Sequence, residues 1–221
     1  VQVPDRCQWY RMILGELARI SDHLTCNGAM AMELGAFTPF LYYMKARELI
    51  WEIMEEETGA RLTHSFGRVG GMAKPPTSFF KDMVSATVPR VMALMGDGER
   101  LLLKNRIFLD RTQGVGLLTR EQAVSFGASG PVLRSTGVDY DVRKDRPYLG
   151  YDSYDFDVAK MNDSLAYEGS AWLGRGRWGE PDRAATVIGR FLAGKGLPLP
   201  EIQCAGQHEP LGIFSVSAPP L

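Results

Sequence analysis

The sequence predicts a mainly α-helical fold, with a helical domain over residues 1–158, short strands after the helices and an irregular tail over residues 159–221. Apolar residues recur at helical spacing in the first half of the chain, and Gly and Pro mark the ends of the long segments. With 221 residues, of which 45% are hydrophobic, the chain is long enough to bury the core of one domain. We therefore expect one folded domain and a poorly ordered extension.

The first long helix is expected over residues 5–34, because its apolar residues follow the three-and-four spacing of one helical face. The residues on this face are Trp9, Ile13, Leu17, Ile20 and Leu24. The polar residues assigned to the opposite face are Glu16, Arg19 and Asp22. Small and flexible residues lie between Gly28 and Gly35. This composition favours a close contact with another helix, or the wall of a cavity.

A second helix is expected to follow Thr38 as its N-cap, with Pro39 in the first helical position and Gly59 just after its end. The residues expected on its solvated face are Lys45, Arg47, Glu48, Glu52, Glu55, Glu56 and Glu57. The residues expected to face inward include Leu41, Met44, Leu49 and Ile53. These two faces predict a helix that packs on one side against the first.

A third helical stretch is expected over residues 77–105. It contains Pro89, which lacks a backbone N–H donor and clashes with the preceding turn of a helix. We therefore expect two segments that meet near Val88. After this stretch the periodicity is lost, and residues 107–109 are predicted to form a short extended run.

The last part of the predicted domain is divided into short pieces by Gly residues. Thr119 and Gln122 have the spacing of a capping box, which predicts a short helix that ends at Gly127. Residues 129–154 lack helical periodicity but are rich in aromatic residues, and this composition argues against disorder. We expect an ordered, irregular segment with short strands there.

Charge and composition exclude several functional classes. The 25 basic and 26 acidic residues give a net charge of -1, so the chain lacks the basic surface that nucleic acid or an anionic membrane would require. No apolar run approaches the roughly 20 residues that cross a bilayer, and residues 1–10 do not resemble a signal peptide. We therefore expect a cytoplasmic chain. The cysteines, too far apart for a zinc site and expected to be reduced thiols, are Cys7, Cys26 and Cys204.

Motifs of self-sufficient enzymes are absent from the sequence. It has no P-loop, no GxGxxG after a strand, no HExxH and no GxSxG, so an autonomous nucleotide enzyme or hydrolase is not supported. The histidines, too few and too scattered for a metal cluster, are His23, His64 and His208. A single His on a helix, such as His23, is most often a structural residue.

One short stretch, residues 63–71 with the sequence THSFGRVGG, contains residue types that suit a loop near an anionic or redox centre. His64 can change its charge near neutral pH, Arg68 is a permanent cation, and the pair Gly70–Gly71 allows close approach of the backbone. Glu33 is a second candidate, because it lies between Met32 and Leu34 and acids in apolar surroundings tend to be paired or functional. The alternative for Glu33 is an ordinary carboxylate at a helix end.

Five blocks of sequence, in order, resemble consecutive segments of one protein family. The blocks are GELARISDHL, MELGAFTPFLYYMKARE, TGARLTHSFGRVGG, NRIFLDRTQGVG and GPVLRSTGVDYDVRKDRPYLGYDSYDFDV. Together they span roughly residues 10–158, and LGAFTPF and GVDYDVRK are the most specific among them. The chain thus resembles a fragment of the quinone-site subunit of complex I, the respiratory NADH:quinone oxidoreductase.

This resemblance implies a helical fold related to the large subunit of nickel–iron hydrogenases, in which the former metal cavity holds the quinone headgroup. In such a complex NADH is oxidised on other chains, and a terminal 4Fe-4S cluster on an iron–sulfur partner reduces the quinone. The resemblance also implies a peripheral position on the cytoplasmic side of the inner membrane. Because the chain lacks cluster-ligating cysteines and CxxC pairs, we expect it to bind no metal or cofactor alone and to be inactive in isolation.

The family's functional residues carry over only in part. Glu33 matches a family aspartate at the quinone cavity that is implied in proton transfer, and Thr38 belongs to the same block. Arg68, Gly70 and Gly71 match the RxGG turn close to the terminal cluster. His64 is implied as a redox-linked proton carrier, although the family often has its histidine at the position of Thr63.

The resemblance does not extend to either end of the family's sequence. The HPxxHG loop and the tyrosine that help to hold the quinone headgroup have no counterpart here, so we expect an incomplete pocket. Residues 159–221 depart abruptly from the family and are expected to be either a divergent extension or the product of a shifted reading frame. Two functional alternatives stay open: a hydrogenase-like large subunit of another membrane-bound complex, and a non-catalytic helical interaction module.

Overall fold

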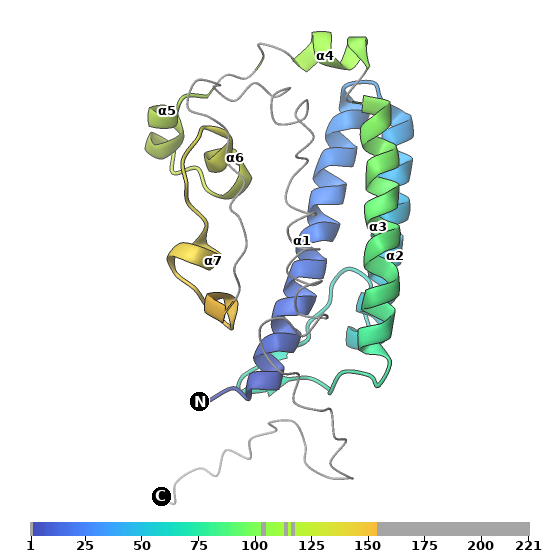
Figure 1. Ribbon diagram of the computed structural model, residues 1–221, viewed down its shortest axis with the longest axis vertical. Helices are drawn as coiled ribbons and strands as arrows, with labels where there is room; N and C mark the ends of the chain where they lie inside the picture. Colours follow the sequence, from blue (N-terminus) through green and yellow to red (C-terminus); the bar gives the residue numbers. More distant parts are fainter. Residues whose placement is uncertain (1, 103–104, 113–114, 116–117, 154–221) are drawn as a thin grey trace, which may run out of the picture.

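The computed structural model describes residues 2–102, 105–112, 115 and 118–153. Three long helices lie side by side: α1 (Asp5–Glu33), α2 (Phe37–Thr58) and α3 (Phe80–Leu102) (Figure 1). A hairpin of β1 (Gly67–Arg68) and β2 (Gly71–Met72) connects α2 to α3. The remaining elements are α4 (Arg106–Thr112), α5 (Arg120–Ser125), α6 (Gly130–Ser135), α7 (Val142–Asp145) and the 3-10 helix η1 (Tyr151–Ser153). The mainly helical prediction is confirmed, whereas the predicted tail lies outside the described residues.

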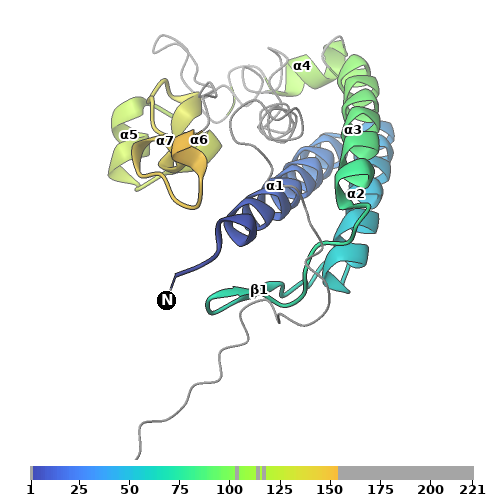
Figure 2. The same cartoon turned by 60° about the horizontal axis from the view of Figure 1, so that its bottom comes forward.

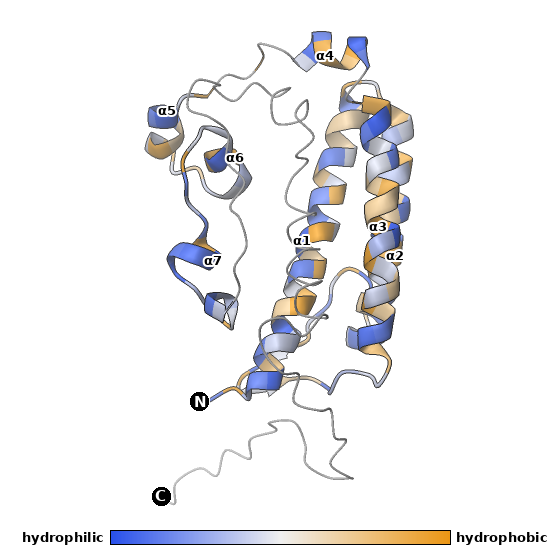
Figure 3. Cartoon of the chain, in the orientation of Figure 1, coloured by the Kyte–Doolittle hydropathy of each residue, from blue (hydrophilic) through white to orange (hydrophobic). Residues whose placement is uncertain are grey.

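The core lies between α1, α2 and α3, whose buried apolar residues form one cluster. Figure 3 shows that hydrophobic and hydrophilic residues alternate along these helices. The fully buried aliphatic residues at the centre of the core include Leu14, Leu17, Leu24, Ile50, Ile53 and Val84. The predicted close contact after residue 27 is confirmed, because a Cβ atom at Gly28 would lie 3.2 Å from the Phe40 ring and 3.4 Å from Tyr43 Cβ. The prediction for Glu16 is wrong, since this residue is fully buried instead of lying on a solvated face.

The start of α2 differs from the prediction, while its end agrees. The N-cap is Ala36 and the helix begins at Phe37, so Thr38 lies inside the first turn and does not cap the helix. Gly59 ends the helix in the left-handed conformation, with φ of +81°, and its N–H donates to the Glu55 carbonyl oxygen. Ala36 is held in the N-cap position by α1, because its N–H donates to the Ala31 carbonyl oxygen. This bond fixes the corner between α1 and α2.

Two residues of α2 lie on the opposite side from the one predicted. Glu57, predicted on the solvated face, is buried against residues of α1 and the loop before α3. Leu41, predicted to face the core, has 51% of its surface exposed. Periodicity alone cannot place either residue, because both lie near an end of the helix, where the neighbouring chain decides which side is covered.

The predicted break at Pro89 is wrong, because α3 is continuous from Phe80 to Leu102. Pro89 itself is exposed, whereas Val84 and Val91, on either side of it, are both buried in the same core. The missing N–H removes one hydrogen bond on the solvent side, while packing against the other helices stabilises both halves.

Further corrections concern the short elements after α3. The extended run predicted over residues 107–109 is part of α4, which begins after Asn105, whose Oδ1 accepts from the Phe108 N–H at 3.2 Å. Residues 129–153 contain α6, α7 and η1, and the described part of this segment contains no strand, contrary to the prediction. The capping box of Thr119 is confirmed, with the Gln122 N–H donating to Thr119 Oγ1 at 3.2 Å.

Two glycines of α3 offer a matched test of how tightly α2 and α3 pack. A Cβ atom at Gly98 would lie 2.8 Å from the Tyr43 ring, whereas a Cβ at Gly96 would meet nothing within 4 Å. We expect Gly98→Ala to lower the free energy of unfolding by about 1–3 kcal/mol through overpacking. Gly96→Ala should raise it by about 0.5–1 kcal/mol, because Ala favours the helix. Urea unfolding measures both, and equal effects of the two substitutions would refute this contact.

Candidate functional site

The hairpin provides the first group of candidate residues. Its strands pair antiparallel, with Gly67 opposite Met72 and Arg68 opposite Gly71. Gly70 lies in the turn with φ of +80°, a conformation that glycine adopts without strain. The hairpin lies near the N-terminal part of α1 (Figure 2). The predicted turn is therefore present, and it carries Arg68 at one of its corners.

The guanidinium of Arg68 is exposed and is held by its own loop. Its Nη1 atom donates to the carbonyl oxygens of Ser65 and Gly67, each at 2.9 Å, and to Ser65 Oγ at 3.3 Å. Within the described ranges no carboxylate forms an ion pair with Arg68. The loop thus presents a fixed positive charge to whatever lies outside this surface.

His64 lies in the same loop, three residues before β1. Its side chain is half-buried, and its ring centroid is 5.3 Å from that of Phe66, with the two planes tilted by 37°. The ring therefore packs against the base of the hairpin while part of it reaches solvent. His64 and Arg68 thus lie in one loop, four residues apart in the sequence.

Glu33 and Thr38 form a second group at the other end of the molecule. Glu33 is the last residue of α1, Thr38 lies in the first turn of α2, and both side chains are exposed. The apolar surroundings expected for Glu33 are therefore not found among the described residues. Arg11, whose side chain contacts the hairpin, and Glu33 are separated by about 33 Å along α1. The structure thus places the predicted residues in two groups and does not bring them together.

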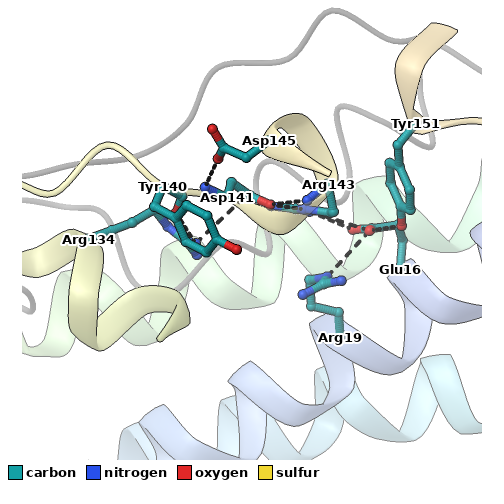
Figure 4. A network of polar contacts seen from close by, with 8 residues as sticks. All are labelled: Glu16, Arg19, Arg134, Tyr140, Asp141, Arg143, Asp145 and Tyr151. Atoms are coloured by element: carbon teal, nitrogen blue, oxygen red, sulfur yellow. Dashed lines mark hydrogen bonds and ion pairs between the residues drawn. The ribbon is translucent and has the colours of Figure 1, made fainter. Parts of the chain in front are cut away.

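A buried ionic network, which the sequence reasoning missed, joins α1 to the segment after α6 (Figure 4). Its centre is Glu16, whose carboxylate accepts from Arg143 Nη1 at 3.3 and 3.4 Å, from the Tyr151 hydroxyl and from Arg19 Nε at 3.3 Å. The side chain of Glu16 is 0% exposed, and that of Arg143 is 2% exposed. The sequence contains one signal that Glu16 is buried. Ile13 and Ile20, three residues before it and four after it, are core residues, and residues at these spacings are neighbours on a helix.

Asp141 is the second carboxylate of this network. It accepts from the Arg143 side chain at 2.6 and 3.0 Å and from the Arg143 N–H at 2.9 Å, and Arg134 Nη1 lies 3.6 Å away. Burial alone would raise the pKa of Asp141, but the hydrogen bonds and charge of Arg143 hold it below its usual value. The pKa of Tyr151 is raised, first by burial and then by the charge of Glu16. Asp141 is therefore ionised and Tyr151 neutral at pH 7, which suits their roles as acceptor and donor.

A third buried carboxylate, Glu57 at the end of α2, was also missed. It accepts hydrogen bonds from the hydroxyls of Tyr10 and Thr77 and from the Thr77 N–H at 3.2 Å. The Tyr10 ring packs edge-on against Phe80, with centroids 5.0 Å apart. These bonds tie the end of α2 to α1 and to the loop before α3, so both ends of the connection that carries the hairpin are anchored.

Neither a metal site nor a membrane span is found in the part of the chain that the structure describes. No three His, Cys, Asp or Glu side chains there are grouped so that they could hold a metal ion. None of the helices there is both long and apolar enough to cross a bilayer.

Comparison with known proteins identifies the family. Residues 33–170 match the sequence model of the respiratory-chain NADH dehydrogenase 49 kDa subunit. Relatives named as the D subunit of NADH-quinone oxidoreductase share 66% identity over 158 residues in Sorangium cellulosum and 48% over 158 residues in Myxococcus xanthus. A relative of the same name from Leptospira biflexa shares 44% identity over 168 residues.

These alignments cover 72%, 72% and 76% of the chain, respectively. They cover 39%, 38% and 41% of the three relatives, so the chain spans about two fifths of their length. The matched region contains the hairpin, the α1–α2 corner and the GVDYDVRK segment, which contributes Asp141 and Arg143 to the buried network. On the basis of this match, the chain belongs to the family of the 49 kDa subunit, also called the D subunit, of the respiratory-chain NADH:quinone oxidoreductase.

Proposed function

We propose that the chain forms part of the quinone-reducing module of complex I, next to the subunit that carries the terminal 4Fe-4S cluster. In this proposal NADH is used on other chains, quinone is the substrate, and the module lies at the cytoplasmic face of the membrane. The observation that carries the proposal is the exposed cation of Arg68, which has no carboxylate partner among the described residues and is fixed on a hairpin of the family's RxGG type.

The hairpin is proposed to face the cluster. A fixed positive charge close to a redox centre stabilises its reduced state, because reduction adds a negative charge. Gly70 and Gly71 leave little side-chain bulk at the turn, so the backbone can approach a partner surface closely. His64, beside the hairpin, is proposed to take up a proton when the cluster is reduced.

The α1–α2 corner is proposed to serve the proton side of the reaction. Glu33 and Thr38 are exposed there, about 33 Å along α1 from the residues that contact the hairpin. One quinone headgroup cannot touch Arg68 and Glu33 at once. We therefore assign the electron-side role to the hairpin and proton delivery into the quinone cavity to Glu33.

A redox titration of the terminal cluster tests the electron-side role. In the assembled complex, Arg68→Gln is expected to lower the cluster's reduction potential. A unit charge at roughly 10–15 Å, with an effective dielectric constant of about 20, contributes roughly 1–2 kcal/mol. This corresponds to roughly 40–90 mV for a one-electron couple. The signal to follow is the electron paramagnetic resonance of the reduced cluster.

Arg90→Gln is the matched control for this titration, because Arg90 is an exposed arginine on α3. It should leave the potential unchanged. Identical potentials for the wild type and Arg68→Gln would remove Arg68 from the surroundings of the cluster, and with it the proposed orientation of the hairpin.

A further inference from the structure

Arg11 of α1 contacts the hairpin at the two residues that close its turn. Its Nη2 atom donates to the Arg68 carbonyl oxygen at 2.6 Å and also to the Gly71 carbonyl oxygen. Arg68 and Gly71 are partners in the strand register. One guanidinium therefore binds both strands at the point from which Arg68 extends.

Among the described residues, few other bonds hold the tip of the hairpin. Its strands have two residues each, and one further backbone bond, from the Ala73 N–H to the Phe66 carbonyl at 2.9 Å, extends the pairing. A ribbon this short is not stable by itself in water. Met72 is buried against the core, but Val69 at the tip is 83% exposed. The bond from α1 is thus a main restraint on the strand that carries Arg68.

We propose that Arg11 is a positioning residue for the Arg68 cation, an inference that rests on the proposed function. By holding the backbone of Arg68 and Gly71 against α1, Arg11 sets the distance between the guanidinium of Arg68 and the cluster of the iron–sulfur partner. Both bonds come from the same Nη2 atom, which the planar guanidinium holds in a fixed direction, whereas the ammonium group of lysine is a compact point charge on a flexible stem.

Arg11→Lys separates this role from a simple effect of charge, because it preserves the charge and loses the rigid plane that directs Nη2 at the two carbonyl oxygens. In the assembled complex, Arg11→Lys is expected to lower the cluster's potential by at least half of the shift caused by Arg68→Gln. In the double variant it should add nothing to that shift, because Arg11 acts through Arg68. Arg6→Lys is the matched control, since Arg6 is an exposed arginine on the same helix.

The outcomes distinguish failure of this inference from failure of the proposed function. If Arg68→Gln does not change the potential, the proposed function fails. If Arg68→Gln lowers it while Arg11→Lys does not, or if the two shifts add, Arg11 is not the positioning residue. If the Arg11→Lys variant does not assemble, amide hydrogen exchange is measured on the full chain instead. Exchange over residues 66–72 should be faster in Arg11→Lys than in Arg6→Lys. Equal exchange in the two variants would overturn the inference.

Discussion

Replacing Glu16 with Ala is expected to destabilise the fold by about 3–5 kcal/mol, the cost of removing one partner from a buried ion pair. The substitution leaves Arg143 buried without its contact to α1 and removes the acceptor for the Tyr151 hydroxyl. Arg143 still has its ion pair with Asp141, so the bonds within the α7 segment remain. The ionic contact between α7 and α1 is lost. The effect should therefore be largest on the packing of the segment after α6 against α1.

Urea unfolding followed by circular dichroism measures this effect. Glu52→Ala is the control, since Glu52 is an exposed glutamate on α2 and its removal should change stability by no more than about 0.5 kcal/mol. Glu16→Gln, which can still accept from Tyr151, should fall between Glu16→Ala and the wild type. Equal stabilities of Glu16→Ala and Glu52→Ala would mean that the network does not hold the two parts together.

Replacing Glu33 with Gln is expected to slow quinone reduction by about 100-fold, the lower end of what a general acid or base contributes. The amide keeps the size and polarity of the side chain but cannot carry a proton at neutral pH. Glu33→Asp should restore most of the rate, because it keeps the acid and matches the residue found in the resembling family. Reduction of an artificial acceptor by NADH should be unchanged in both variants, since it does not require the quinone site.

The two activities are measured in the same membranes, with a short-chain quinone and with the artificial acceptor. Glu52→Gln serves as the control for loss of an exposed glutamate. A wild-type rate of quinone reduction in Glu33→Gln would remove Glu33 from the reaction. A parallel loss of both activities would instead indicate a defect in assembly.

The long helices were predictable because their periodicity and their glycine stops are local signals. The end of α2 at Gly59 and the capping box at Thr119 depend only on neighbouring residues, and both predictions are confirmed. The wrong predictions depend on distant contacts. Pro89 stays within α3 because the helices around it pack on both of its halves, and Glu16 is buried because Arg143, far along the chain, pairs with it.

The candidate site was predictable in its parts but not in its arrangement. The hairpin around Gly70 follows from local glycines, and the structure confirms the turn. The separation of Glu33 from that hairpin follows from the lengths of α1 and α2 and from their antiparallel packing, which no motif encodes. The role of Arg11 could not be predicted either, because its partners are backbone carbonyls distant in sequence.

The most direct test of the quinone-site assignment is a titration of a quinone analogue against the chain alone and against the chain bound to its iron–sulfur partner. We predict saturable binding only when the partner is present, because the described residues place the candidate groups at two exposed ends of the bundle. Fluorescence quenching reports the binding, and Glu33→Gln in the same complex checks its location. Stable binding of the partner without any binding of the quinone analogue would contradict the proposal and make the chain an interaction module.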